Sequence, residues 1–174
     1  MPGRPKREDY TTNLTAYNKA GRVLWQKREK LAVIVGVHAV DGVLVVETSN
    51  NGAGAILASK TALIHPDLGG VTWVSGSPLF AQPADHAMLF TQASSQAPQV
   101  EDGLNFQRVT LRPKLSVTPI HFDPPTRPNC GEAQGFYDAF GQPTFEGQFI
   151  SVKRQDTCGE FVARFDWLTA PAAH

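Results

Sequence analysis

The sequence has few cysteines, no long apolar run and no excess of either charge. Its two cysteines among 174 residues, Cys130 and Cys158, are too few for a small secreted domain held together by many disulfides. No apolar run approaches the roughly 20 residues that a bilayer requires, which excludes a membrane-spanning helix. Sixteen basic and sixteen acidic residues give a formal net charge of zero. We therefore expect a soluble globular protein that is not basic over its whole surface, as many nucleic-acid binders are.

Motifs for nucleotide binding and serine hydrolysis are also absent. No glycine-rich segment ends in Gly-Lys-Ser or Gly-Lys-Thr, and Gly52 and Gly54 lack the third glycine of a dinucleotide-binding turn. The nearest match to a nucleophile elbow, residues 74–78, is typical of a simple turn. The basic N-terminal residues MPGRPKREDY lack the apolar stretch of a signal peptide, so we expect an intracellular or particle-associated protein.

Turn-forming residues between β-prone segments predict four hairpins. The turns are residues 18–21, 40–42, 138–141 and 155–159. The strands around the second turn, LAVIVGVHAVDGVLVVETS, are apolar at nearly every position, so we expect both of their faces to be covered at the centre of the fold. Residues 161–167 instead alternate between apolar and polar, which predicts a strand with one buried face.

The hairpins predict a mainly β protein, an antiparallel β sandwich or barrel with one or two short helices. The helix candidates are the alanine-rich segments Gly54 to Leu63 and Ala84 to Ala93. We expect residues 1–30 to form a basic N-terminal segment with the first hairpin. Residues 31–170 would form a single β-rich domain, with a polar internal loop at 91–103, and residues 171–174 a tail.

Charge is unevenly distributed along the chain. Residues 1–30 contain eight basic and three acidic residues, a net charge of plus five, which leaves minus five for the remainder. Such an arm can neutralise phosphates or dock on a neighbouring subunit, although it is also typical of a solvated chain end. The candidate partner-binding residues are Arg4, Lys6, Arg7, Lys19, Arg22, Lys27 and Arg28.

Aromatic residues are interleaved with these basic residues. Tyr10, Tyr17 and Trp25 lie among them, a mixture that proteins use to stack on bases while following phosphates. The simpler interpretation, which we favour, is that Trp25 begins the hydrophobic core, because tryptophan is usually largely buried.

The cysteines offer a candidate for catalysis. Cys130 would be activated as a nucleophile if a short helix began at Asn129, because backbone N–H groups at a helix start favour the thiolate. His121 is a candidate base, with His86 as the other choice, and Glu132 would be a nearby acid or base. The candidate catalytic residues are therefore Cys130, Glu132 and His121.

A zinc site is the second candidate. Cys130-Gly131-Glu132 matches the ligand-x-Glu element of zinc-dependent deaminases, but Phe161 stands where the ligand after Cys158 belongs. His86, Cys130 and Cys158 are left as candidate ligands for a zinc site of another type. A disulfide or two ordinary thiols is the simpler interpretation of the cysteines.

Taken together, these features favour a non-catalytic binding or assembly domain that needs no cofactor. Its expected partners are further copies of itself or another protein, or a nucleic acid contacted through the N-terminal segment, as in a virion or phage component. One alternative is a small cysteine- or zinc-dependent enzyme centred on Cys130, acting on an amide or a nucleobase. The other is a module that inhibits a partner protein.

Overall fold

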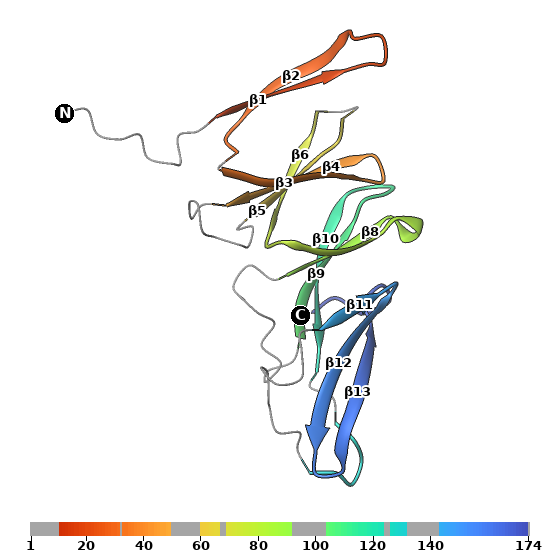
Figure 1. The fold of residues 1–174 in the computed structure, drawn as a ribbon. Coiled ribbons are helices and arrows are strands. Elements are labelled where there is room, and N and C mark those ends of the chain that lie inside the picture. The colour runs from red at the N-terminus through yellow and green to blue at the C-terminus, as the bar shows by residue number, and fades with distance from the viewer. Residues whose placement is uncertain are drawn as a thin grey trace, which may run out of the picture. The chain divides into compact units, whose positions relative to one another are not determined.

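The computed structural model describes residues 11–31, 33–49, 60–66, 69–91, 104–123, 126–131 and 143–173. Most of these residues form β-strands, arranged in four antiparallel sheets (Figure 1). The chain divides into two compact units, Met1–Ser77 and Pro78–His174. Within the described ranges no helix is long and apolar enough to cross a membrane.

The first unit contains a hairpin and a four-stranded sheet. The hairpin consists of β1 (Thr12–Tyr17) and β2 (Val23–Glu29). The sheet has the order β3 (Val33–Val40), β4 (Val43–Ser49), β5 (Lys60–Ile64) and β6 (Val71–Ser75). Both predicted hairpins of this unit are thus confirmed.

Local turn chemistry explains these two hairpins. In the first turn the Asn18 side-chain oxygen accepts hydrogen bonds from the N–H groups of Ala20 and Arg22, both at 2.9 Å. In the second turn Asp41 and Gly42 both have positive φ, as a two-residue hairpin turn requires.

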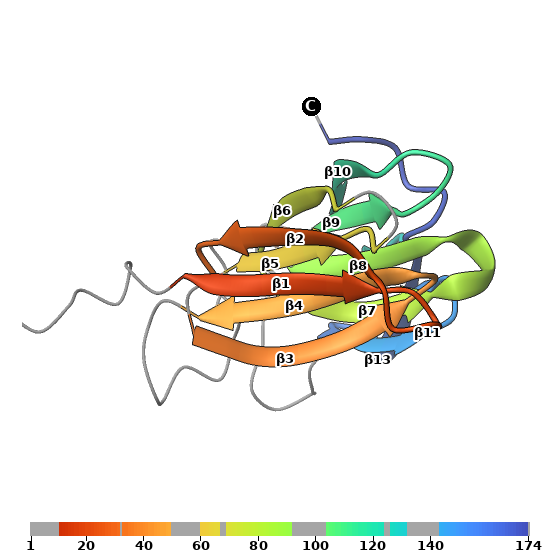
Figure 2. The same cartoon turned by 90° about the horizontal axis from the view of Figure 1, so that it is seen from above.

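The β1–β2 hairpin lies over one face of the sheet (Figure 2). Leu14 and Trp25 pack against a buried cluster of the sheet and its entry segment, formed by Leu31, Val46, Ala62 and Ile64. The Trp25 indole N–H donates to the Pro66 carbonyl, and the ring lies against Gly69, where a Cβ atom would come within 3.3 Å of it. Trp25 is therefore partly buried and packs against the core, which agrees in part with the simpler interpretation.

The strands of the second hairpin differ in burial. β4 is covered on both faces, since the neighbouring residues Val45 and Val46 are both buried, as predicted. The same prediction is wrong for β3, which is an edge strand with mostly exposed side chains. β3 is the more apolar of the two strands, but between these two only β4 has a described strand on both sides.

The second unit contains two sheets. The first has the order β10 (Ser116–Phe122), β9 (Leu104–Thr110), β8 (Ala87–Thr91) and β7 (Pro78–Gln82). The second has the order β11 (Thr144–Glu146), β12 (Phe149–Asp156) and β13 (Gly159–Asp166). The β12–β13 pair confirms the fourth predicted hairpin, whereas the third predicted turn lies outside the described residues.

The two sheets of this unit share one hydrophobic cluster, as the layers of a sandwich do. Its buried members include Leu89 and Phe106 from the first sheet and Ile150 from the second, with Trp167 just after β13. The rings of Phe106 and Phe145 also meet edge to face across the layers, with centroids 6.3 Å apart.

The helix candidates are wrong over most of their described residues, although Ala84 and Asp85 lie in a short helical turn. Residues 60–64 form β5 and residues 87–91 form β8, and the only helical turn among the described residues is the 3-10 turn η2 (Pro83–Asp85). Residues 54–59 lie outside the description. Alanine favours helix locally, but Met88, Leu89 and Phe90 are consecutive buried residues, and a central strand can bury both of its faces.

Candidate functional site

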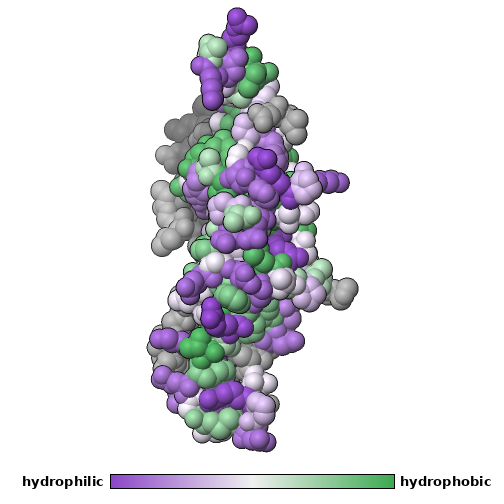
Figure 3. Space-filling view, turned by 90° about the vertical axis from the view of Figure 1, so that its right-hand side faces the viewer, coloured by the Kyte–Doolittle hydropathy of each residue, from purple (hydrophilic) through white to green (hydrophobic). Residues whose placement is uncertain are grey.

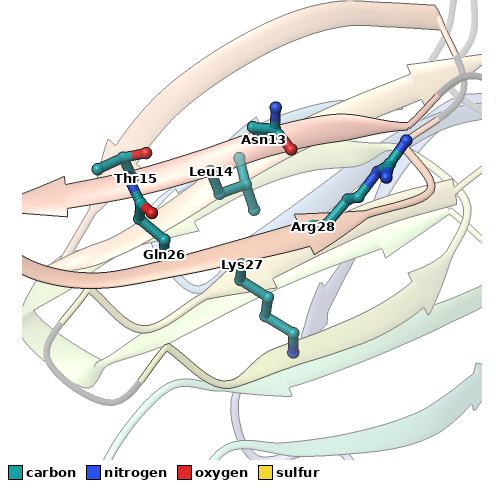
Figure 4. Close-up of a pocket in the computed structure, with 6 residues that line it drawn as sticks. All are labelled: Asn13, Leu14, Thr15, Gln26, Lys27 and Arg28. Carbon is teal, nitrogen blue, oxygen red and sulfur yellow. The ribbon is translucent and has the colours of Figure 1, made fainter.

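A pocket of about 490 Å³ lies on the β1–β2 hairpin (Figure 4). Three consecutive pairs of the antiparallel register line it. These pairs are Asn13 with Arg28, Leu14 with Lys27, and Thr15 with Gln26. The pocket therefore lies in the segment whose charge pattern suggested partner binding.

The register decides which side chains face the sheet and which face away. Opposite residues of an antiparallel pair share a face, so Leu14 and Lys27 lie on the same side as Trp25. Asn13, Thr15, Gln26 and Arg28 lie on the opposite side, which we call the outer face. Figure 4 shows Arg28 and Asn13 pointing away from the side to which Lys27 points.

The outer face is rich in hydrogen-bond donors. It offers two side-chain amides, a hydroxyl and a guanidinium group. Arg28 Nε donates to Thr11 Oγ1 at 3.0 Å, which positions the guanidinium along β1. Because Arg28 is exposed, its terminal nitrogens are accessible to a partner.

Most of the N-terminal charge lies on this hairpin and the residues that flank it. Residues 11–31 contain five basic residues and one acidic residue, a net charge of plus four. Lys27 is paired with Glu29 at 2.8 Å, which offsets its charge on the inner side. Lys19, Arg22 and Arg28 are all exposed and supply the positive charge around the turn and the outer face.

Apolar side chains accompany the charge near the turn. Tyr17 is 61% exposed, and Val23 and Leu24 are about as exposed. Hydrophilic and hydrophobic side chains consequently lie next to each other on the β1–β2 hairpin, at the top of Figure 3. Among the described aromatic residues of the N-terminal segment, Tyr17 has the side chain that can stack on a base. Trp25 packs against the sheet instead.

The predicted partner-binding residues thus fall into two groups. Lys19, Arg22, Lys27 and Arg28 lie on one hairpin, but Lys27 is on its inner side and the other three are at the turn or on the outer face. Arg4, Lys6 and Arg7 lie outside the described residues. Asn13, Thr15 and Gln26 were not predicted, because uncharged residues on a strand give no signal until the register places them beside Arg28.

Cys130 and Cys158 form a disulfide with a Cα–Cα distance of 5.6 Å. While this bond is intact, neither sulfur can act as a nucleophile or bind a metal ion, so both proposed roles require the reduced protein. Among the described residues, a carboxylate oxygen of Asp156 lies within 4.8 Å of both sulfurs. The third predicted ligand, His86, is not part of that group, and Glu132 lies outside the described residues.

The two histidines have structural surroundings of their own. His121 Nδ1 lies 2.8 Å from Asn105 Oδ1, and its Nε2 lies 3.5 Å from Asp123 Oδ1. His86 ends the turn η2 in the left-handed conformation, and its carbonyl accepts the N–H of Leu111 at 2.7 Å. Neither arrangement includes Cys130.

An ion pair that sequence reasoning missed lies beside the disulfide. Arg127 Nε donates to the buried Asp156 carboxylate at 2.7 Å, and Arg127 Nη2 bonds both that carboxylate and the Gly159 carbonyl. The hydrogen bond from Arg127 holds the pKa of Asp156 below its ordinary value. Arg127 also lies 4.5 Å from the centroid of the Phe161 ring. These contacts hold the segment before Cys130 against the β12–β13 turn, which is a structural role.

Comparison with models of known protein families and with curated protein sequences finds no match for this chain.

Proposed function

We propose that this chain is a non-catalytic binding protein whose β1–β2 hairpin contacts the phosphates of a nucleic acid. The observation that carries the proposal is the outer face of the hairpin, where an exposed arginine and amide and hydroxyl side chains are among the residues that line the pocket. Arginine, asparagine, glutamine and threonine are among the side chains that make phosphate contacts in protein–nucleic acid complexes.

The position of the charge supports this proposal. The net charge of plus four over residues 11–31 belongs to a chain with no net charge, so the attraction for phosphates is local. A local basic surface on a neutral protein gives binding that weakens as salt is added, because bound phosphates release their counterions.

The packing of the hairpin supports it as well. Leu14 and Trp25 fix the inner side of the hairpin to the sheet, so the outer face is turned away from the sheet. A surface held in place in this way loses little conformational entropy on binding.

The test compares two double variants that remove the same charges. K19Q/R28Q removes one lysine and one arginine from the hairpin, and K153Q/R164Q removes the same residue types from exposed positions of β12 and β13. Binding to a fluorescent oligonucleotide of about 20 nucleotides is measured by anisotropy between about 50 and 200 mM salt. We expect the slope of log K against log salt to fall by about two for K19Q/R28Q and to stay unchanged for K153Q/R164Q.

Two results would overturn the proposal. The first is a wild-type protein that does not bind single-stranded or duplex oligonucleotide at low salt. The second is an equal loss of binding in both double variants, because the attraction would then belong to the total charge and not to the hairpin.

A further inference from the structure

Strand β3 presents an exposed apolar edge. It is eight residues long, is the outermost strand of its sheet and pairs only with β4 among the described strands (Figure 2). Four of its large apolar side chains, Val33, Ile34, Val35 and Val37, are between 39% and 55% exposed. No strand among the described residues pairs with its outer N–H and C=O groups.

Five other strands lie at the edges of the four-stranded and three-stranded sheets, and each has a feature that hinders pairing with another strand. These strands are β6, β7, β10, β11 and β13. β10 contains Pro119, whose carbonyl accepts the N–H of Ala173, and β7 begins with Pro78. β11 has only three residues and β6 five, and β13 carries the exposed charges Glu160 and Arg164. Proline, short length and charge are devices that prevent edge pairing.

The protective feature of β3 itself is a single irregularity. The register with β4 shifts between Ile34 and Gly36, which leaves Val35 as the extra residue. From Gly36 to Val40 the pairing with β4 is continuous, so more than half of the strand has regular geometry.

We infer that β3 pairs with β3 of a second copy of this chain, antiparallel around a two-fold axis. Two copies would then share one continuous eight-stranded sheet, in which each copy contributes β3, β4, β5 and β6. A two-fold axis passing near Val37, within the stretch of regular geometry, would place Val37 of each copy opposite Val37 of the other, so an apolar pair would lie at the axis.

The charge of β3 favours a second copy as the occupant of this edge. A two-fold axis brings each surface against itself, so a strongly charged strand would repel its own copy. His38 is the single ionisable residue of β3, and its Nε2 lies 2.8 Å from Glu47 Oε1 within the same chain. The basic β1–β2 hairpin, by contrast, would repel itself.

The test introduces a charge on the proposed edge and on a matched position elsewhere. Val37 and Val162 are 55% and 56% exposed, and both lie on edge strands, β3 and β13. Sedimentation velocity of the full chain is measured from micromolar to near-millimolar concentration. We expect wild type and V162K to form dimers, and V37K to be monomeric or to have a dimer dissociation constant at least tenfold higher.

V37E provides a second variant, because a negative charge at this position should weaken the dimer as V37K does. Circular dichroism and thermal unfolding establish that each variant is folded. A wild-type monomer at every concentration would overturn the inference. So would a V37K dimer as tight as wild type, or equal dissociation of V37K and V162K.

Discussion

At the scale of single residues, the best-defined interaction is the ion pair between Arg127 and Asp156. It combines two guanidinium–carboxylate hydrogen bonds with a third bond from the Cys158 N–H to Asp156 Oδ1 at 2.8 Å. Bidentate pairs of this kind favour the ionised carboxylate. Asp156 thus contributes to stability only while it is charged.

The lowered pKa of Asp156 predicts a loss of stability in acid. Below its ordinary pKa of 3.8, the unfolded chain takes up a proton that the folded protein resists, so the stabilisation declines and is lost as pH falls through the lowered folded value. We expect D156N to be less stable than wild type at neutral pH and the difference to shrink toward pH 3. Urea unfolding at a series of pH values measures it.

D123N is the control for this prediction, because the Asp123 carboxylate is 97% exposed. The explanation would be contradicted if the difference between D156N and wild type stayed constant with pH, or if D123N reproduced it.

At the scale of elements, the disulfide joins residues 126–131 to the β12–β13 turn. It closes a span of 28 residues, and the Gly131 N–H donates to Thr157 Oγ1 at 2.7 Å beside it. A side chain at residue 131 would place its Cβ 2.8 Å from Thr157 Cγ2, which is too close for any residue except glycine unless Thr157 moves.

Reduction of the disulfide should therefore destabilise the protein. A closed loop of this length predicts a loss of about 3 to 4 kcal/mol in the free energy of unfolding, because the unfolded chain regains conformational freedom. Chemical denaturation with and without a phosphine reductant measures the loss. The C130S/C158S variant should be as unstable as the reduced protein and insensitive to the reductant, and a reductant effect of equal size in that variant would refute the explanation.

Several elements could be predicted from the sequence because local signals sufficed. Alternation over residues 161–167 predicts one buried face, and in β13 Val162 is exposed while Phe161 and Phe165 are partly buried. The turns at Asn18 and Asp41 follow from side-chain capping and positive φ. These features depend on residues that are neighbours in the chain.

Other elements could not be predicted because they depend on distant neighbours. β3 is more apolar than β4, and only the pairing of β4 with β5 makes β4 a central strand and β3 an edge. The segment containing Met88 and Phe90 is strand because other strands pair on both sides of it, which overrides the helix preference of its alanines.

Part of the candidate site could also be predicted from the sequence, and part of it could not. Charge and aromatic spacing indicated Arg28 and Lys19, and the preference of tryptophan for the interior indicated Trp25 as a core residue. The contribution of Asn13 and Gln26 appears only once the register is known. Arg127 and Asp156 are 29 residues apart, and no sequence pattern joins them.

At the scale of the whole molecule, the two proposals rest on different parts of the first unit. The nucleic-acid proposal depends on the outer face of β1 and β2, and the dimer proposal depends on the edge of β3. Each can fail without the other. If both hold, a dimer presents two basic hairpins to the same nucleic acid, which strengthens binding to a long strand without any new contact.

Backbone hydrogen exchange with and without a single-stranded oligonucleotide tests the central claim most directly. If the hairpin is the contact surface, amides of residues 12–29 should exchange more slowly in the complex, while those of β12 and β13 should exchange as in the free protein. Protection confined to the second unit, or no change along the hairpin while the oligonucleotide is bound, would contradict the proposed function.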